Sequence, residues 1–108
     1  MTTDEVYIRH MLDAIDEIMT TLHGVSYIQL VNEPMRMHAT VRLFEILGEA
    51  ASKLTIDLRK QHADIPFGDI IGMRNKLIHH YFEVDLEILW RVYEDDLVEL
   101  QESLKKLL

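Results

Sequence analysis

Apolar side chains recur every three or four positions along most of the chain, which is the period of an α-helix. Thr2 and Glu5 precede the first stripe at the spacing of a capping box, in which each side chain satisfies a backbone N–H that the helix leaves unpaired. Glycine readily adopts the left-handed conformation that ends a helix, so we expect this helix to end near Gly24. Its stripe consists of Ile8, Met11, Leu12, Ile15, Ile18, Met19 and Leu22.

Two features divide the middle of the chain. Residues 25–30 form a short apolar run, which is either the start of a second helix or a packed connection. The Asn-Glu-Pro motif at residues 32–34 marks a break, because the residue before a proline is pushed away from helical geometry. A long helix is then predicted over residues 35–60. Its small side chains at residues 48–51 (Gly-Glu-Ala-Ala) would let another helix approach closely.

The C-terminal half holds one more break and two more predicted helices. The break covers residues 61–69, which include Pro66 and Gly68. Apolar residues between 70 and 78 indicate a helix of about ten residues. The last helix has Asp85 as its predicted N-cap and keeps the helical period to the end of the chain. Because no segment alternates like a β-strand, we predict an all-α fold, a four- to five-helix up-and-down bundle that forms a single domain over residues 1–108.

Composition restricts the kinds of partner. Eleven Lys and Arg against nineteen Asp and Glu give a formal net charge of −8. This charge argues against a broad, non-specific coat of nucleic acid and leaves only a local basic site for RNA; no DNA binding is expected. A chain of this size buries only about two-thirds of its unfolded surface, so a second copy that covers an apolar face would stabilise it.

Composition also restricts the compartment. The absence of cysteine excludes disulfides, thiolate metal ligands and cysteine nucleophiles, and it fits a reducing environment. The N-terminus lacks the basic start and apolar run of a signal peptide. No stretch approaches the roughly 20 apolar residues that span a bilayer. We therefore expect a soluble, cytoplasmic protein without a membrane partner.

The segment from Arg74 to Tyr81 carries the densest chemistry in the chain. Its sequence, Arg-Asn-Lys-Leu-Ile-His-His-Tyr, combines two cations, an amide, two imidazoles and a phenol. On an ideal helix Arg74 and His79 point about 140° apart, and His79 and Tyr81 about 160° apart. These side chains share one site only if the helix ends near His79 or if a second subunit completes the site. Both options place the group at a helix C-terminus.

This segment matches the Arg-x4-His pattern of HEPN domains, in the extended Arg-x4-His-x-Tyr form. The chain thereby resembles the toxins of HEPN–nucleotidyltransferase toxin–antitoxin pairs. Residues 43–51 look like the central helix of that family, and residues 70–73 and 84–86 look like its motif flanks. The resemblance implies a HEPN-like bundle that forms a homodimer, with two Arg/His sets around a shared cleft. It also implies a ribonuclease that needs no metal and no cofactor.

The resemblance implies roles for individual residues. Arg74 and His79 would be the catalytic pair, since an imidazole transfers protons near neutral pH and a guanidinium stabilises the charge of the phosphate transition state. Asn75 would orient either group. Tyr81 would support the site and accept AMP from the partner nucleotidyltransferase, the antitoxin, which would silence the toxin by adding phosphate charge beside Arg74.

Each of these residues also has a structural interpretation. Arg74 could pair with Glu49. Glu49 is either an interface carboxylate or a residue that holds Arg74 in place without touching the substrate. His79 could be a core histidine that bonds a backbone carbonyl, and Tyr81 a packing residue. His80 points another way on any helix, so we expect it to be exposed or structural.

Two alternative functions stay open at this point. One is a non-catalytic HEPN module that binds nucleotides or RNA, and the other is a scaffold partner of a nucleotidyltransferase. The intact motif favours the ribonuclease over the binding module, whereas the acidic charge fits the scaffold. The histidines show no metal-ligand spacing. A metal site built from His79, His80 and Glu83 is not expected.

Overall fold

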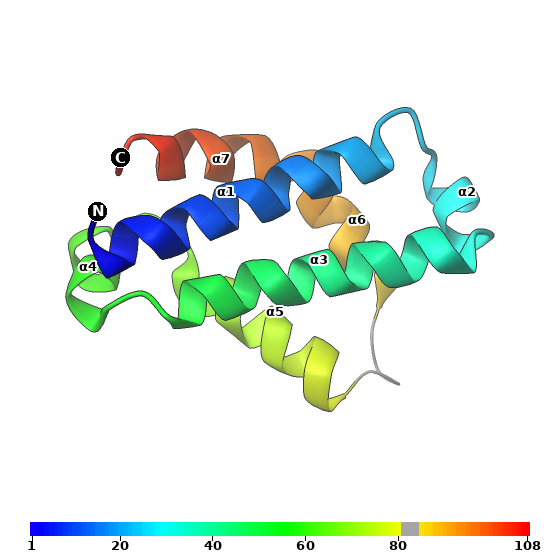
Figure 1. Ribbon diagram of the computed structural model, residues 1–108. Helices are drawn as coiled ribbons and strands as arrows, with labels where there is room; N and C mark the ends of the chain where they lie inside the picture. Colours follow the sequence, from blue (N-terminus) through cyan, green and yellow to red (C-terminus); the bar gives the residue numbers. More distant parts are fainter. Residues whose placement is uncertain (81–84) are drawn as a thin grey trace.

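Helices form every regular element among residues 1–80 and 85–108, the part of the chain that this computed structural model describes (Figure 1). That part contains seven helices and no strand. The helices are α1 (Thr3–Leu22), α2 (Tyr27–Val31), α3 (Pro34–Ser52), α4 (Ile56–Gln61), α5 (Phe67–His79), α6 (Leu86–Asp95) and α7 (Leu97–Lys105). The predicted all-α fold is confirmed.

The bundle is built on α1 and α3, which run antiparallel and side by side (Figure 1). α7 also packs on α1, and α5 packs on α3. The stripe predicted for the first helix faces the core, because five of its members are buried and the other two are partly buried. The fully buried side chains include Ile8, Met11, Ile15, Ile18, Leu22, Phe44, Leu47, Leu97 and Leu104.

Both ends of α1 follow from the local sequence. The Thr2 hydroxyl accepts a hydrogen bond from the Glu5 N–H (3.1 Å), and the Glu5 carboxylate accepts one from the Thr2 N–H (3.3 Å). The predicted capping box is therefore present. Gly24 turns the chain with φ of +72°, a conformation that glycine adopts at little cost. The apolar run after it forms α2, which Ser26 caps.

The single helix predicted over residues 35–60 is wrong, because residues 53–55 separate α3 from α4. Thr55 explains the break. Its hydroxyl oxygen accepts a hydrogen bond from the Leu58 N–H (3.3 Å), while its own N–H and hydroxyl donate to the Asp4 carboxylate (2.9 and 2.7 Å). A threonine that caps a new helix competes with continuation of the old one, and Asp4 fixes the turn beside the start of α1.

The last predicted helix is divided as well. Asp85 caps α6 as expected, since its carboxylate accepts a hydrogen bond from the Glu87 N–H (3.0 Å). α6 and α7 then meet at Asp96, which is the C-cap of one helix and the N-cap of the other. The apolar period continues through the buried Leu97, so periodicity alone conceals the break. The described part of the chain thus has seven helices rather than four or five.

α5 lies at the edge of the bundle, against α3 (Figure 1). Its buried side chains are Phe67, Ile70 and Leu77. The helix that it contacts most is α3. The C-terminal end of α5 projects from the bundle (Figure 1). None of the described helices combines the length and apolar character that a membrane span needs.

Candidate active site

The motif residues Arg74, Asn75 and His79 all lie on α5, which begins at Phe67 and ends at His79. His80 is the C-cap, and its backbone N–H donates to the Lys76 carbonyl (2.9 Å). The helix therefore continues through His79, so Arg74 and His79 keep the different directions of two residues on one helix. Tyr81 lies outside the described residues, and so does Glu83 of the disfavoured metal alternative.

Arg74 lies where α5 meets α3. The position that a Cβ would occupy on Gly48 of α3 is 2.2 Å from the Arg74 Cβ and 3.0 Å from the Ile70 carbonyl oxygen. The two helices can approach this closely only because Gly48 has no side chain. The small side chains around position 48 predicted a close approach of some helix, but the sequence did not indicate that the approaching residue is Arg74.

The Arg74 guanidinium is held by an amide. Its Nη1 donates to the Asn75 Oδ1 (2.7 Å), and its Nε is buried with no acceptor among the described residues. Glu49 is exposed, and no ion pair joins it to Arg74 in the described part of the chain. The structure thus brings Asn75 to Arg74, and Arg74 keeps its full positive charge.

Three of the other arginines form ion pairs with carboxylates, whereas Arg9 and Arg59 form none among the described residues. Arg36 pairs with Glu33, Arg42 with Glu45 (3.2 Å) and Arg91 with Glu87 (3.0 Å), each within or at the start of one helix. The hydrogen bond from Arg36 lowers the pKa of Glu33 below its ordinary value. Because no carboxylate of the described residues pairs with Arg74, its charge is available to a phosphate.

His79 is exposed at the end of α5, and His80 beside it is exposed too. Five helical positions separate Arg74 from His79, which corresponds to about 7.5 Å along the axis and about 140° around it. One copy of α5 therefore presents the cation and the imidazole on different sides. No group of three His, Asp or Glu residues that could hold a metal ion occurs within residues 1–80 and 85–108.

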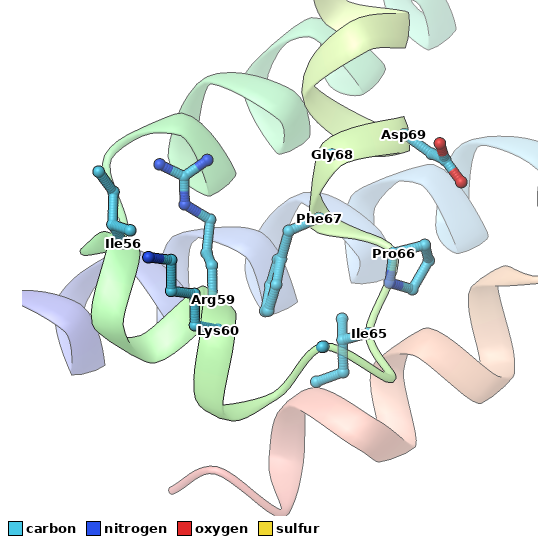
Figure 2. A pocket seen from close by; sticks show the side chains of 9 residues that line it. Ile56, Arg59, Lys60, Ile65, Pro66, Phe67, Gly68 and Asp69 are labelled. Atoms are coloured by element: carbon cyan, nitrogen blue, oxygen red, sulfur yellow. The ribbon is translucent and has the colours of Figure 1, made fainter.

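A hollow lies at the end of α5 opposite His79. Figure 2 shows Arg59 and Lys60 of α4 on one side of it, beside Phe67, with Asp69 pointing away on the other side. Its volume is about 550 Å³. Its lining contains no histidine, whereas His79 and His80 lie at the other end of α5. Sequence reasoning missed this hollow because it placed Arg59 and Lys60 inside a continuous helix.

The helical fold and the Arg74/His79 pair on one helix define the chain as a HEPN-type domain. It belongs to the ribonuclease HepT-like family, whose model matches residues 11–107. This match covers the motif and nearly the whole bundle.

Curated relatives match over most of their length. "Putative RNase TTE0752" of Caldanaerobacter subterraneus subsp. tengcongensis is 35% identical over 108 residues, which cover 100% of this chain and 96% of that protein. "Putative RNase MJ1216" of Methanocaldococcus jannaschii is 31% identical over 96% of this chain and 86% of its own. "Probable ribonuclease HepT" of Thermococcus cleftensis is 31% identical over 94% of this chain and 92% of its own. No solved structure matches the chain significantly.

Proposed function

We propose that the chain is a metal-independent endoribonuclease, the toxin of a toxin–antitoxin pair, and that Arg74 and His79 form its catalytic pair. The observation that carries the proposal is the state of Arg74, whose charge is oriented by a neutral amide and not cancelled by a carboxylate. His79 stands exposed at the end of the same helix. The ribonuclease names of the relatives support the same substrate class.

These groups fit cleavage of RNA by its own 2′-hydroxyl. A neutral His79 takes the proton of that hydroxyl, whose oxygen then attacks the phosphorus. The bond from phosphorus to the 5′-oxygen breaks, and a protonated His79 donates a proton to the leaving oxygen. Arg74 stabilises the negative charge that gathers on the phosphate oxygens. The products are a 2′,3′-cyclic phosphate and a 5′-hydroxyl.

The proposal includes a homodimer. Acid and base catalysis in one turnover uses two imidazoles, and each chain offers one motif histidine. Arg74 and His79 of a single α5 point about 140° apart, whereas a second copy related by two-fold symmetry can place its His79 opposite the first copy's Arg74. The exposed end of α5 is the part of the helix that a second copy can reach.

RNA cleavage by purified protein in EDTA tests the proposal. Arg74→Ala and His79→Ala should each lower the rate at least about 100-fold, since each removes charge stabilisation or proton transfer from the transition state. Arg91→Ala and His38→Ala are matched controls, because Arg91 is paired with Glu87 and His38 is exposed on α3. Cyclic-phosphate ends should appear with the wild type and with both controls.

Circular dichroism of every variant shows whether the fold is retained. Full activity of a folded His79→Ala protein would remove His79 from the catalytic pair. A wild-type protein that cleaves neither tRNA nor mRNA would instead favour the non-catalytic module or the scaffold.

The proposal extends to regulation by a nucleotidyltransferase antitoxin that transfers AMP to Tyr81. The phosphate charge added there would repel RNA beside Arg74. Incubation with such an enzyme and labelled ATP should label the wild-type chain and the Tyr7→Phe control, but not Tyr81→Phe. Mass spectrometry that finds AMP on the Tyr81→Phe chain would identify another acceptor.

A further inference from the structure

We infer that Gly48 is a positioning residue for Arg74: it sets the depth at which α5 lies on α3, and thereby the place of the Arg74 guanidinium in the active site. The inference rests on the proposed ribonuclease function. Gly48 does not touch the substrate. It acts through the helix that carries Arg74.

The contact itself is tighter than any side chain would allow. A Cβ on Gly48 would lie 2.2 Å from the Arg74 Cβ, 2.9 Å from the Arg74 Cγ and 3.0 Å from the Ile70 carbonyl oxygen. Carbon atoms in ordinary contact are about 3.5–4.0 Å apart. Space, and not backbone conformation, requires glycine here, since Gly24 is the described glycine with a positive φ.

The atoms that face Gly48 cannot move aside on their own. The Arg74 Cβ and the Ile70 carbonyl are fixed to the α5 backbone, so no change of side-chain rotamer relieves the overlap. A methyl group at position 48 therefore displaces α5 as a unit by roughly an ångström, because packed helices leave no void to absorb it. Misplacement of a catalytic group by this distance costs on the order of 100-fold in rate.

The displacement acts on Arg74 more than on the rest of the bundle. α5 contacts the bundle mainly through α3, and Gly48 faces α5 at the residue that carries the cation. The Arg74 Nε is buried at this contact, so a shift of α5 changes both its burial and the direction of the guanidinium. The contact between α1 and α3 is a different one, so it stays intact when α5 shifts.

Gly48→Ala and Gly72→Ala form a matched pair. Both add one methyl group to a helical glycine without a positive φ, but a Cβ on Gly72 has nothing within 4 Å. We expect Gly48→Ala to lower kcat of RNA cleavage about 100-fold, with KM changed much less, because RNA still reaches an intact surface. Gly72→Ala should stay within about twofold of the wild type.

An NMR readout that does not depend on activity accompanies the kinetics. The Nε–H signal of Arg74, assigned through its loss in Arg74→Lys, should shift and exchange faster with water in Gly48→Ala, and stay in place in Gly72→Ala. Arg59 also has a buried Nε without an acceptor among the described residues, and its signal should not move in either variant. If wild-type protein does not cleave RNA, the proposed function fails, and the Arg74 signal still decides the role of Gly48.

If Gly48→Ala does not fold, a double variant that moves the glycine from α3 to α5 provides a second test. The double variant Gly48→Ala/Arg74→Gly removes the Arg74 Cβ that the new methyl group meets. Its melting temperature should exceed that of Gly48→Ala, although each single change alone destabilises, because the two changes relieve one shared contact. Additive effects in this cycle, or an unchanged Arg74 signal and full activity in Gly48→Ala, would overturn the inference.

Discussion

At the scale of single residues, the partner of Arg74 decides whether the arginine can bind a phosphate. Arg36, Arg42 and Arg91 hold carboxylates, and their charge is satisfied inside the protein. Arg74 holds the Asn75 amide, which fixes the direction of the guanidinium and leaves its net charge unchanged. An oxyanion that approaches Arg74 therefore meets no carboxylate paired with it in residues 1–80 and 85–108.

Replacement of this amide by a carboxylate should inactivate the site. In Asn75→Asp a negative charge takes the place of the Oδ1 that lies 2.7 Å from Arg74 Nη1, and it competes with the substrate phosphate. We expect kcat/KM for RNA cleavage to fall by roughly 100-fold, and by only about tenfold in Asn75→Ala, which loses orientation but adds no charge.

Steady-state kinetics of the two variants at equal ionic strength make the comparison. An Asn75→Asp enzyme as active as Asn75→Ala would mean that Asn75 acts through something other than the charge of Arg74.

The sequence contained part of this site and not the rest. The resemblance to HEPN domains implied that Arg74 and His79 act as a pair and that Asn75 orients one of them. The role of Gly48 was not accessible, since a patch of small side chains indicates that a helix approaches but not which residue it brings. Glu49 stayed ambiguous for the same reason, and the structure leaves it exposed and unpaired with Arg74 among the described residues.

At the scale of helices, local signals indicated three of the helix ends but not the break at Thr55, although Thr55 caps α4 through the Leu58 N–H only three residues away. The capping box before α1, Gly24 after it and Asp85 before α6 all act within a few residues. The break at Thr55 depends on Asp4, which is 51 positions away. The apolar period continues across both breaks. Periodicity alone therefore predicted one helix where the structure has α3 and α4, and one where it has α6 and α7.

α5 also shows how one helix can separate two functions. Ile70 packs against α3 and Leu77 in the last turn is buried, whereas His79 at the end of the helix is exposed. Arg74 therefore lies at the contact with α3, and His79 lies on the solvent side. A helix that is continuous through His79 keeps the two side chains on different sides, which is why a single chain does not assemble the proposed site.

At the scale of the whole molecule, charge limits where RNA can approach. The net charge of −8 repels a polyanion at long range, but the repulsion fades beyond about 8–10 Å at physiological salt. Within that distance a local group of positive charges decides the outcome. Arg74 and Lys76 lie near the exposed end of α5, where neither is bound in an ion pair among the described residues.

A mixture of two inactive variants tests whether the site is shared between two copies. If Arg74 of one chain acts with His79 of the other, an Arg74→Ala/His79→Ala mixed dimer contains one site in which both residues are intact. An equimolar mixture that is allowed to exchange subunits should therefore be more active than either variant alone. Its rate should stay below about one quarter of the wild-type rate, because the mixed dimer keeps only one of the two His79 imidazoles.

Each variant alone should stay inactive in the same assay of RNA cleavage. A mixture as inactive as its components, although mass spectrometry detects mixed dimers, would place Arg74 and His79 of one site on a single chain.

Under the proposed toxin function, the contact between Gly48 and Arg74 has a consequence for genetics. A glycine codon becomes an alanine codon through one nucleotide change, and the resulting methyl group meets α5 at 2.2 Å. Such a change would remove most of the RNA cleavage while the helices stay folded. Cells that escape growth inhibition would then carry mutations in codons of α3, well outside the Arg-x4-His motif. The part of the gene under selection is therefore larger than the motif.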